Sequence, residues 1–154
     1  MKAGRHERGI AYIALLIAIA VIGVGLAAAG TVWSEASQRE KERELLFVGE
    51  QFRRAIQQYY ESGVIEKKYP PNLDALLYDP RFPGIRRYLR RIYRDPMSGT
   101  AEWGLQRAPD GGIMGVFSLR DDIVAHRRVN FPRHLAGFEG KTRTSEWVFS
   151  YAPK

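Results

Sequence analysis

The hydrophobic positions of this chain fall into one long apolar block followed by segments with a regular spacing. Residues 10–34 contain no Asp, Glu, Lys, Arg, His, Asn or Gln. As a helix rising about 1.5 Å per residue, residues 10–33 would be about 36 Å long, more than the bilayer's hydrocarbon core of about 30 Å. The block therefore predicts a transmembrane helix over residues 10–34.

The helix is expected to continue beyond the apolar block. Residues 34–44 are rich in helix formers and contain no proline. An apolar stripe with a spacing of three or four residues follows, made of Leu45, Val48, Phe52, Ile56 and Tyr59 or Tyr60. This pattern predicts one helix from about Ile10 to about Tyr60, whose outer half, residues 35–61, packs on a globular domain, residues 62–154.

Shorter elements are predicted within residues 62–154. Asn72 or Asp74 can cap a short helix of leucines. Residues 85–94 place apolar residues at helical spacing on one face and arginines on the other, which predicts an amphipathic basic helix. A turn at residues 108–112 separates two strand-like runs and predicts a hairpin. Residues 146–151 predict a last strand, and residues 121–144 a long surface loop.

These elements predict an α+β fold: a long N-terminal α-helix, transmembrane in its first half, packed on a small antiparallel β-sheet domain. The length of 154 residues fits one domain and one small core. The basic residues Lys2, Arg5 and Arg8 precede the apolar block. They place the N-terminus in the cytoplasm and the C-terminal domain in the periplasm, as a single-pass inner-membrane protein.

The composition excludes several kinds of chemistry. The chain has no cysteine, which excludes disulfides, thiolate zinc sites, iron–sulfur clusters and cysteine nucleophiles. The three histidines, His6, His126 and His134, lack the spacing of a helical zinc motif, and no serine lies in a nucleophile elbow. We therefore expect a protein that is not an enzyme.

The order of the segments resembles the type IV pilin-like proteins, and more narrowly the major, G-like pseudopilins of type II secretion. A short basic leader ends in Gly9 and runs directly into the apolar helix. The globular matches are Tyr69-Pro70, Tyr88-Leu89, Asp95-Pro96-Met97-Ser98-Gly99, Trp103-Gly104-Leu105, and Gly111-Gly112 leading to Val116-Phe117-Ser118-Leu119.

The resemblance implies a filament subunit. A prepilin peptidase would remove residues 1–9 by cutting between Gly9 and Ile10, and would methylate the new N-terminus. The mature helix, with Tyr12, Ala14, Leu16, Gly23 and Gly25, would then pack against the helices of copies or other pseudopilins in a helical filament. An inner-membrane secretion platform would be a further partner. The family usually has glutamate at the fifth mature position, where this chain has Ala14, so a major and a minor role both stay open.

Other surfaces and functions are also open. The arginines at 86, 87, 90, 91 and 94 form a basic stripe that could face Glu40, Glu42 or Glu44 of an adjacent subunit. The same stripe is compatible with a type IV pilus or DNA-uptake (competence) pilin, although nucleic acid is not the expected partner. A third interpretation is a Sec-exported periplasmic binding domain that is cut near Ala29.

No cofactor is expected from the residues themselves. G-like pseudopilins often hold Ca²⁺ in the loop before the last strands, where the candidate ligands in this chain are Asp121 and Asp122. The same loop contains several arginines, which disfavour a cation.

Overall fold

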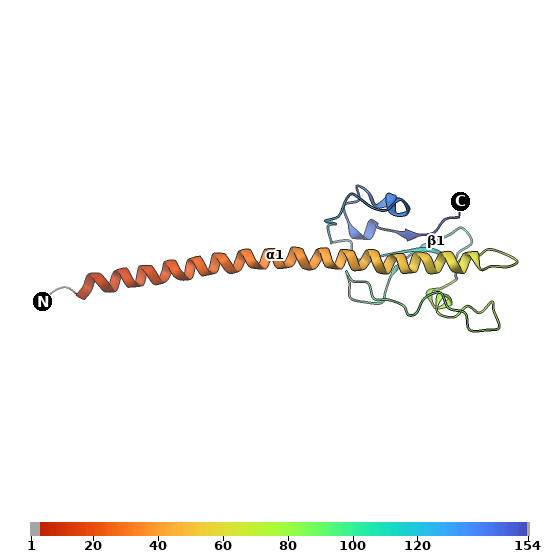
Figure 1. Ribbon diagram of the computed structural model, residues 1–154, viewed down its shortest axis with the longest axis horizontal. Helices are drawn as coiled ribbons and strands as arrows, with labels where there is room; N and C mark the ends of the chain where they lie inside the picture. Colours follow the sequence, from red (N-terminus) through yellow and green to blue (C-terminus); the bar gives the residue numbers. More distant parts are fainter. Residues whose placement is uncertain (1–3, 154) are drawn as a thin grey trace. The chain divides into compact units, whose positions relative to one another are not determined.

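The structure, a computed structural model, describes residues 4–153, with the side chains of residues 12–23 and 33–153. The first element is helix α1, Gly4–Glu61, with 58 residues (Figure 1). The described part of the predicted leader, residues 4–9, is therefore helical. The chain divides into two compact units, one up to Gln38 and one from Arg39 onward.

The predicted transmembrane segment is the first correction. Among the residues whose side chains the structure describes, no helical stretch is long and apolar enough to cross a membrane. A membrane-crossing helix needs about 20 consecutive apolar residues, and the described part of the apolar block, residues 12–23, is shorter. The fold class with a transmembrane first half and the single-pass inner-membrane location are therefore wrong.

The second unit contains a three-stranded antiparallel sheet in the order β1-β2-β3. Strand β1, Gly104–Arg107, pairs with β2, Ile113–Phe117, and β2 pairs with β3, Phe149–Ser150. The predicted hairpin is confirmed, since Leu105 lies opposite Val116 across β1 and β2. The last strand, predicted over residues 146–151, is limited to Phe149–Ser150, and Glu146 belongs to the 3-10 helix η3, Thr144–Glu146.

The part of α1 in the second unit covers this sheet with its apolar stripe. Leu45, Phe52 and Ile56 are fully buried, as the helical spacing predicted. Gly49 permits the close approach of β3: a Cβ at this position would lie 2.4 Å from the Phe149 ring. Trp147 and Phe149 complete the core.

The predicted basic helix over residues 85–94 does not form. The backbone N–H groups of Tyr88 and Leu89 both donate to the Leu76 carbonyl, and Asp79 N–H donates to the Arg86 carbonyl. These bonds hold the segment beside the short 3-10 helix η1, Leu73–Leu76, whose predicted cap Asn72 is confirmed. Arginines four residues apart would also repel one another along a helix.

The segment 121–144 is a third correction. It was expected to be a surface loop, but it contains the 3-10 helix η2, Arg133–Phe138, and contributes Phe131, Leu135 and Phe138 to the core. Phe138 stacks on Trp147, with ring centroids 5.8 Å apart. Aromatic packing therefore ties this irregular segment to the sheet.

Candidate functional site

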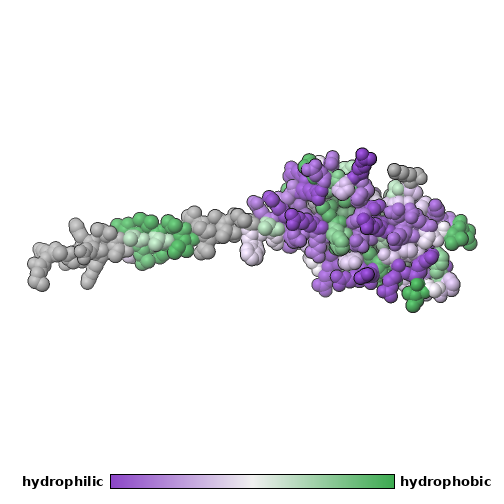
Figure 2. Space-filling model, in the orientation of Figure 1, coloured by the Kyte–Doolittle hydropathy of each residue, from purple (hydrophilic) through white to green (hydrophobic). Residues whose placement is uncertain are grey.

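In the first unit of the chain, helix α1 carries an apolar surface that is not covered by any other described residue. The large apolar side chains between Tyr12 and Ile22 are 48% to 67% exposed. They are Tyr12, Ile13, Leu15, Leu16, Ile17, Ile19, Val21 and Ile22. Figure 2 shows this stretch as a continuous hydrophobic band.

The band surrounds the helix rather than marking one face. Consecutive residues of an α-helix are separated by about 100°, so neighbours such as Leu15, Leu16 and Ile17 point in different directions. Large exposed apolar patches on proteins mark binding surfaces. A helix that is apolar on every side needs apolar partners all round.

The predicted residues of the assembly helix are only partly described. Tyr12, Ala14 and Leu16 are exposed. Gly23 has open space around it, because a Cβ there would have no neighbouring atom within 4 Å. The surroundings of Gly9, Ile10 and Gly25 lie outside what the structure describes, although their backbone is part of α1.

The five arginines of the predicted basic stripe, Arg86, Arg87, Arg90, Arg91 and Arg94, are all exposed on an irregular segment. Among the described residues, none of them forms an ion pair within 4.0 Å. Arg86 stacks on the Phe82 ring at 4.1 Å, and Arg91 lies over Tyr93 at 5.2 Å. The segment therefore presents unpaired guanidinium groups beside aromatic rings.

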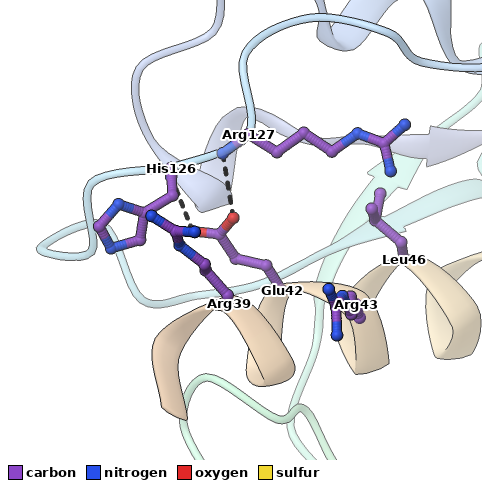
Figure 3. A pocket seen from close by; sticks show the side chains of 6 residues that line it. All are labelled: Arg39, Glu42, Arg43, Leu46, His126 and Arg127. Atoms are coloured by element: carbon purple, nitrogen blue, oxygen red, sulfur yellow. Dashed lines mark hydrogen bonds between the residues drawn. The ribbon is translucent and has the colours of Figure 1, made fainter. Parts of the chain in front are cut away.

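One of the expected acidic partners of these arginines is not accessible. Glu42 is only 3% exposed, and its carboxylate accepts the backbone N–H groups of His126 and Arg127 at 2.8 and 3.1 Å. This bond pair fastens the loop at 126–127 to α1 (Figure 3). The sequence carries a signal for this burial, because Glu42 lies three residues before Leu45 and so on the face of the apolar stripe, unlike the exposed Glu40 and Glu44.

Beside Glu42, a cavity of about 390 Å³ is lined by basic side chains. The side chains of Arg39 and His126 lie next to each other on one side of Glu42, and Arg127 extends toward Leu46 (Figure 3). Arg127 lies over the Phe131 ring at 4.7 Å and donates to the carbonyls of Val129 and Asn130. The cavity therefore has a positively charged lining, in which Arg127 is held in place by the Phe131 ring and two backbone carbonyls.

A second buried carboxylate, Asp79, organises the end of α1. Arg81 donates to both Asp79 oxygens, and the Tyr88 hydroxyl donates to Oδ2 at 2.7 Å. Burial raises the pKa of Asp79, but the hydrogen bonds from Arg81 and Tyr88 outweigh burial and hold it below its usual value. Arg81 also donates to the Tyr59 carbonyl and to Ser62 Oγ.

This group of side chains was not predicted. In the sequence, the pair Asp79-Pro80 indicates only where a short helix ends. The buried contacts join residues 59–62 to residues 79–88, and no local spacing reveals such a pairing. These contacts hold residues 79–88 against the C-terminal end of α1 and the residues that follow it.

The candidate calcium ligands do not form a cluster in the structure. Asp122 accepts two hydrogen bonds of 2.7 Å from Arg120, and it is exposed, as is Asp121. Among residues 4–153 as described, no group of three or more His, Asp or Glu side chains is placed to hold a metal ion. Calcium binding stays an untested prediction.

Comparisons with known protein families, with characterised proteins and with solved structures find no match for this chain. Its function therefore has to be inferred from its own residues.

Proposed function

We propose that this chain is a structural subunit of a helical filament, the pseudopilus of a type II secretion system. In this proposal a prepilin peptidase cuts between Gly9 and Ile10, and the filament drives protein export across the outer membrane. The chain itself performs no catalysis, and its partners are copies of itself or other pseudopilins.

The observation that carries the proposal is the exposed apolar helix of residues 12–23. Burying a Leu, Ile or Val side chain stabilises an association by about 1.5–3 kcal/mol relative to leaving it in water. Seven such side chains, together with Tyr12, are exposed on successive turns of this one helix. Packing of this helix against equivalent helices would cover every side of it, as a filament with central helices requires.

Association of this kind is tested by placing a charge in the apolar band. In the Ile17→Asp variant, packing helices would have to bury a carboxylate, which is strongly unfavourable. We expect sedimentation and electron microscopy to show a loss of filaments or oligomers for Ile17→Asp. Leu119→Asp, at an apolar residue that is 53% exposed in the second unit, is the matched control and should assemble normally.

Equal assembly by wild type and Ile17→Asp would contradict the proposal. Loss of assembly in both variants would show a general effect of added charge and would also count against it.

A DNA-uptake pilin is the second candidate, and the basic segment favours it. The unpaired arginines lie beside Phe82 and Tyr93, as in surfaces that combine phosphate contacts with stacked bases. If this function holds, changing Arg86, Arg90 and Arg94 together to Gln should weaken DNA binding and uptake and leave enzyme secretion unchanged. Impaired secretion with unchanged DNA uptake would favour the pseudopilus instead.

A further inference from the structure

The basic cavity beside Glu42 takes no part in the packing of the apolar helix. Its volume of about 390 Å³ lies in the range of cavities that hold small ligands, about 300–1,000 Å³. All of its lining residues belong to the second unit. They are Arg39, Glu42, Arg43, Leu46, His126 and Arg127.

Two distant segments of the chain form the basic cavity. Arg39 and Arg43 lie four residues apart, on one face of α1. His126 and Arg127 come from the loop that follows β2. Glu42 joins the two segments, because its carboxylate oxygens accept the backbone N–H groups of the loop (Figure 3). The protein therefore fixes the walls of the cavity by itself.

Positive charge exceeds negative charge in this cavity. Three arginines line it together with a single carboxylate, so two positive charges remain even when His126 is uncharged. The carboxylate of Glu42 reduces the attraction for an anion. It is only 3% exposed, however, and each of its oxygens already accepts a backbone N–H group. An anion with about two negative charges would balance the cationic side chains that remain.

Most of these cationic side chains have no acidic partner. Among the described residues, no carboxylate oxygen lies within 4.0 Å of a side-chain nitrogen of Arg39, His126 or Arg127. Arg43 pairs with Glu40 at 3.2 Å, but these side chains are 75% and 71% exposed. Ion pairs as exposed as this one contribute little to stability, so Arg43 can exchange its partner for another anion.

Arg127 is held in position for binding. Its guanidinium lies 4.7 Å from the centre of the Phe131 ring and donates to the carbonyls of Val129 and Asn130. A guanidinium has five N–H donors, so these two bonds leave further donors for a ligand. Because the protein already restricts this side chain, little conformational freedom is lost on binding.

We propose that the basic cavity binds a phosphate group. The planar guanidinium fork matches the oxygens of phosphate, and several arginines can contact different oxygens of one tetrahedral anion. A phosphate monoester carries about 1.5–2 negative charges at pH 7, which fits the excess of positive charge. A carboxylate has one charge and two oxygens, and fits it less well. The site is separate from the apolar helix, so the inference does not depend on the proposed function.

Binding of inorganic phosphate to the full chain tests the proposal. Equilibrium dialysis with radiolabelled phosphate, at constant ionic strength, is carried out on wild type, Arg39→Gln and Arg127→Gln. We expect saturable binding by wild type and an affinity about tenfold lower for each variant, because each loses one charge-assisted contact. If urea unfolding shows that Arg127→Gln is not folded, Arg43→Gln takes its place.

Arg133→Gln is the matched control. Arg133 is an exposed arginine that does not line the cavity, so its replacement removes the same charge from the protein. This variant should bind phosphate as wild type does. Equal weakening in the control and in the cavity variants would show an effect of net charge alone and would overturn the inference.

Vesicles distinguish a soluble phosphate from the headgroup of a lipid, which has the same chemistry. Wild type and Arg39→Gln are sedimented with phosphatidylcholine vesicles that contain phosphatidic acid. Binding that is weaker for Arg39→Gln supports a lipid headgroup as the source of the phosphate. Equal binding of both proteins to vesicles, with weaker binding of inorganic phosphate by the variant, supports a soluble phosphate. If Arg39→Gln weakens neither kind of binding, the cavity is not a phosphate site.

Discussion

At the scale of single residues, buried carboxylates hold the irregular parts of the second unit in place. Asp95 is fully buried and accepts hydrogen bonds from the Met97 N–H at 2.9 Å and the Ser118 hydroxyl at 2.7 Å. Glu42 and Asp79 act in the same way on the loops at 126–127 and 79–88. Each carboxylate satisfies donors that a loop without regular structure would otherwise leave unpaired.

The buried pair of Asp79 and Arg81 gives the first prediction. Asp79→Asn removes the charge that Arg81 and Tyr88 bind, and leaves the guanidinium without its ion pair. We expect the free energy of unfolding, measured in urea, to fall by about 2–3 kcal/mol. Asp122→Asn is the control, because Asp122 and Arg120 form a similar pair on the surface; it should have little effect. Equal effects of the two changes would contradict this role for Asp79.

Glu50 gives a prediction about pH. Burial raises its pKa, but hydrogen bonds from Arg53 and Arg54 outweigh burial and lower the pKa to about 2, from the ordinary value of 4.5. A folded-state pKa below the unfolded value stabilises the protein above pH 4.5, and this stabilisation is lost as the pH falls toward 2. The contribution is on the order of 2 kcal/mol after screening by solvent.

The measurement is the free energy of unfolding between pH 2 and pH 6 for wild type and Glu50→Gln. Wild type should lose stability more steeply below pH 4.5 than the variant. Parallel curves would show that Glu50 does not carry this pH dependence.

At the scale of elements, the spacing of apolar residues predicted correctly which face of the helix is buried and where the hairpin forms. The stripe from Leu45 to Tyr59 is buried as its spacing indicated, and the hairpin of β1 and β2 follows its turn signal. The segment of residues 85–94 has the same helical spacing but is irregular. Its backbone bonds to Leu76 and Asp79 come from distant parts of the chain, which no local pattern reveals.

The contact of Glu42 was also not predicted, because it too joins distant parts of the chain. The loop at 126–127 bonds to Glu42 across more than eighty residues of sequence. The apolar helix of residues 12–23 could be predicted from the sequence, because a run of apolar residues is recognised without knowledge of any distant contact. The membrane span predicted over residues 10–34 was wrong, since none of the described helical stretches is long and apolar enough to cross a bilayer.

Helix α1 and strand β3 meet at Gly49, which gives a prediction at this scale. In Gly49→Ala the new methyl group would lie 2.4 Å from the Phe149 ring, so the ring or the helix must move. We expect a loss of about 1–3 kcal/mol in stability, although alanine favours helix by about 1 kcal/mol. Gly137→Ala, where no atom lies within 4 Å, is the control for thermal unfolding. A stabilised Gly49→Ala variant would contradict the close contact of α1 and β3.

At the scale of the whole molecule, the chain presents one apolar surface and one basic surface. The apolar helix of residues 12–23 has exposed side chains in every direction, and the arginines between residues 86 and 94 form the basic surface. In the proposed function, the apolar helix packs against copies of itself.

The net charge is +7 for the full chain and +5 once residues 1–9, with three Lys or Arg and one Glu, are removed; it opposes close association of copies at low salt. Added salt should therefore promote assembly until the charges are screened. Light scattering measured against salt concentration should rise. A steady fall would contradict this prediction and indicate that ion pairs drive assembly.

The central claim is that the mature protein keeps its apolar N-terminal helix and assembles through it. The most direct test is the N-terminal residue and intact mass of the protein isolated from its native filament fraction. The account predicts a chain that begins at Ile10, with a methylated amino group. A mature chain that begins at Gly30, without the helix, would contradict it.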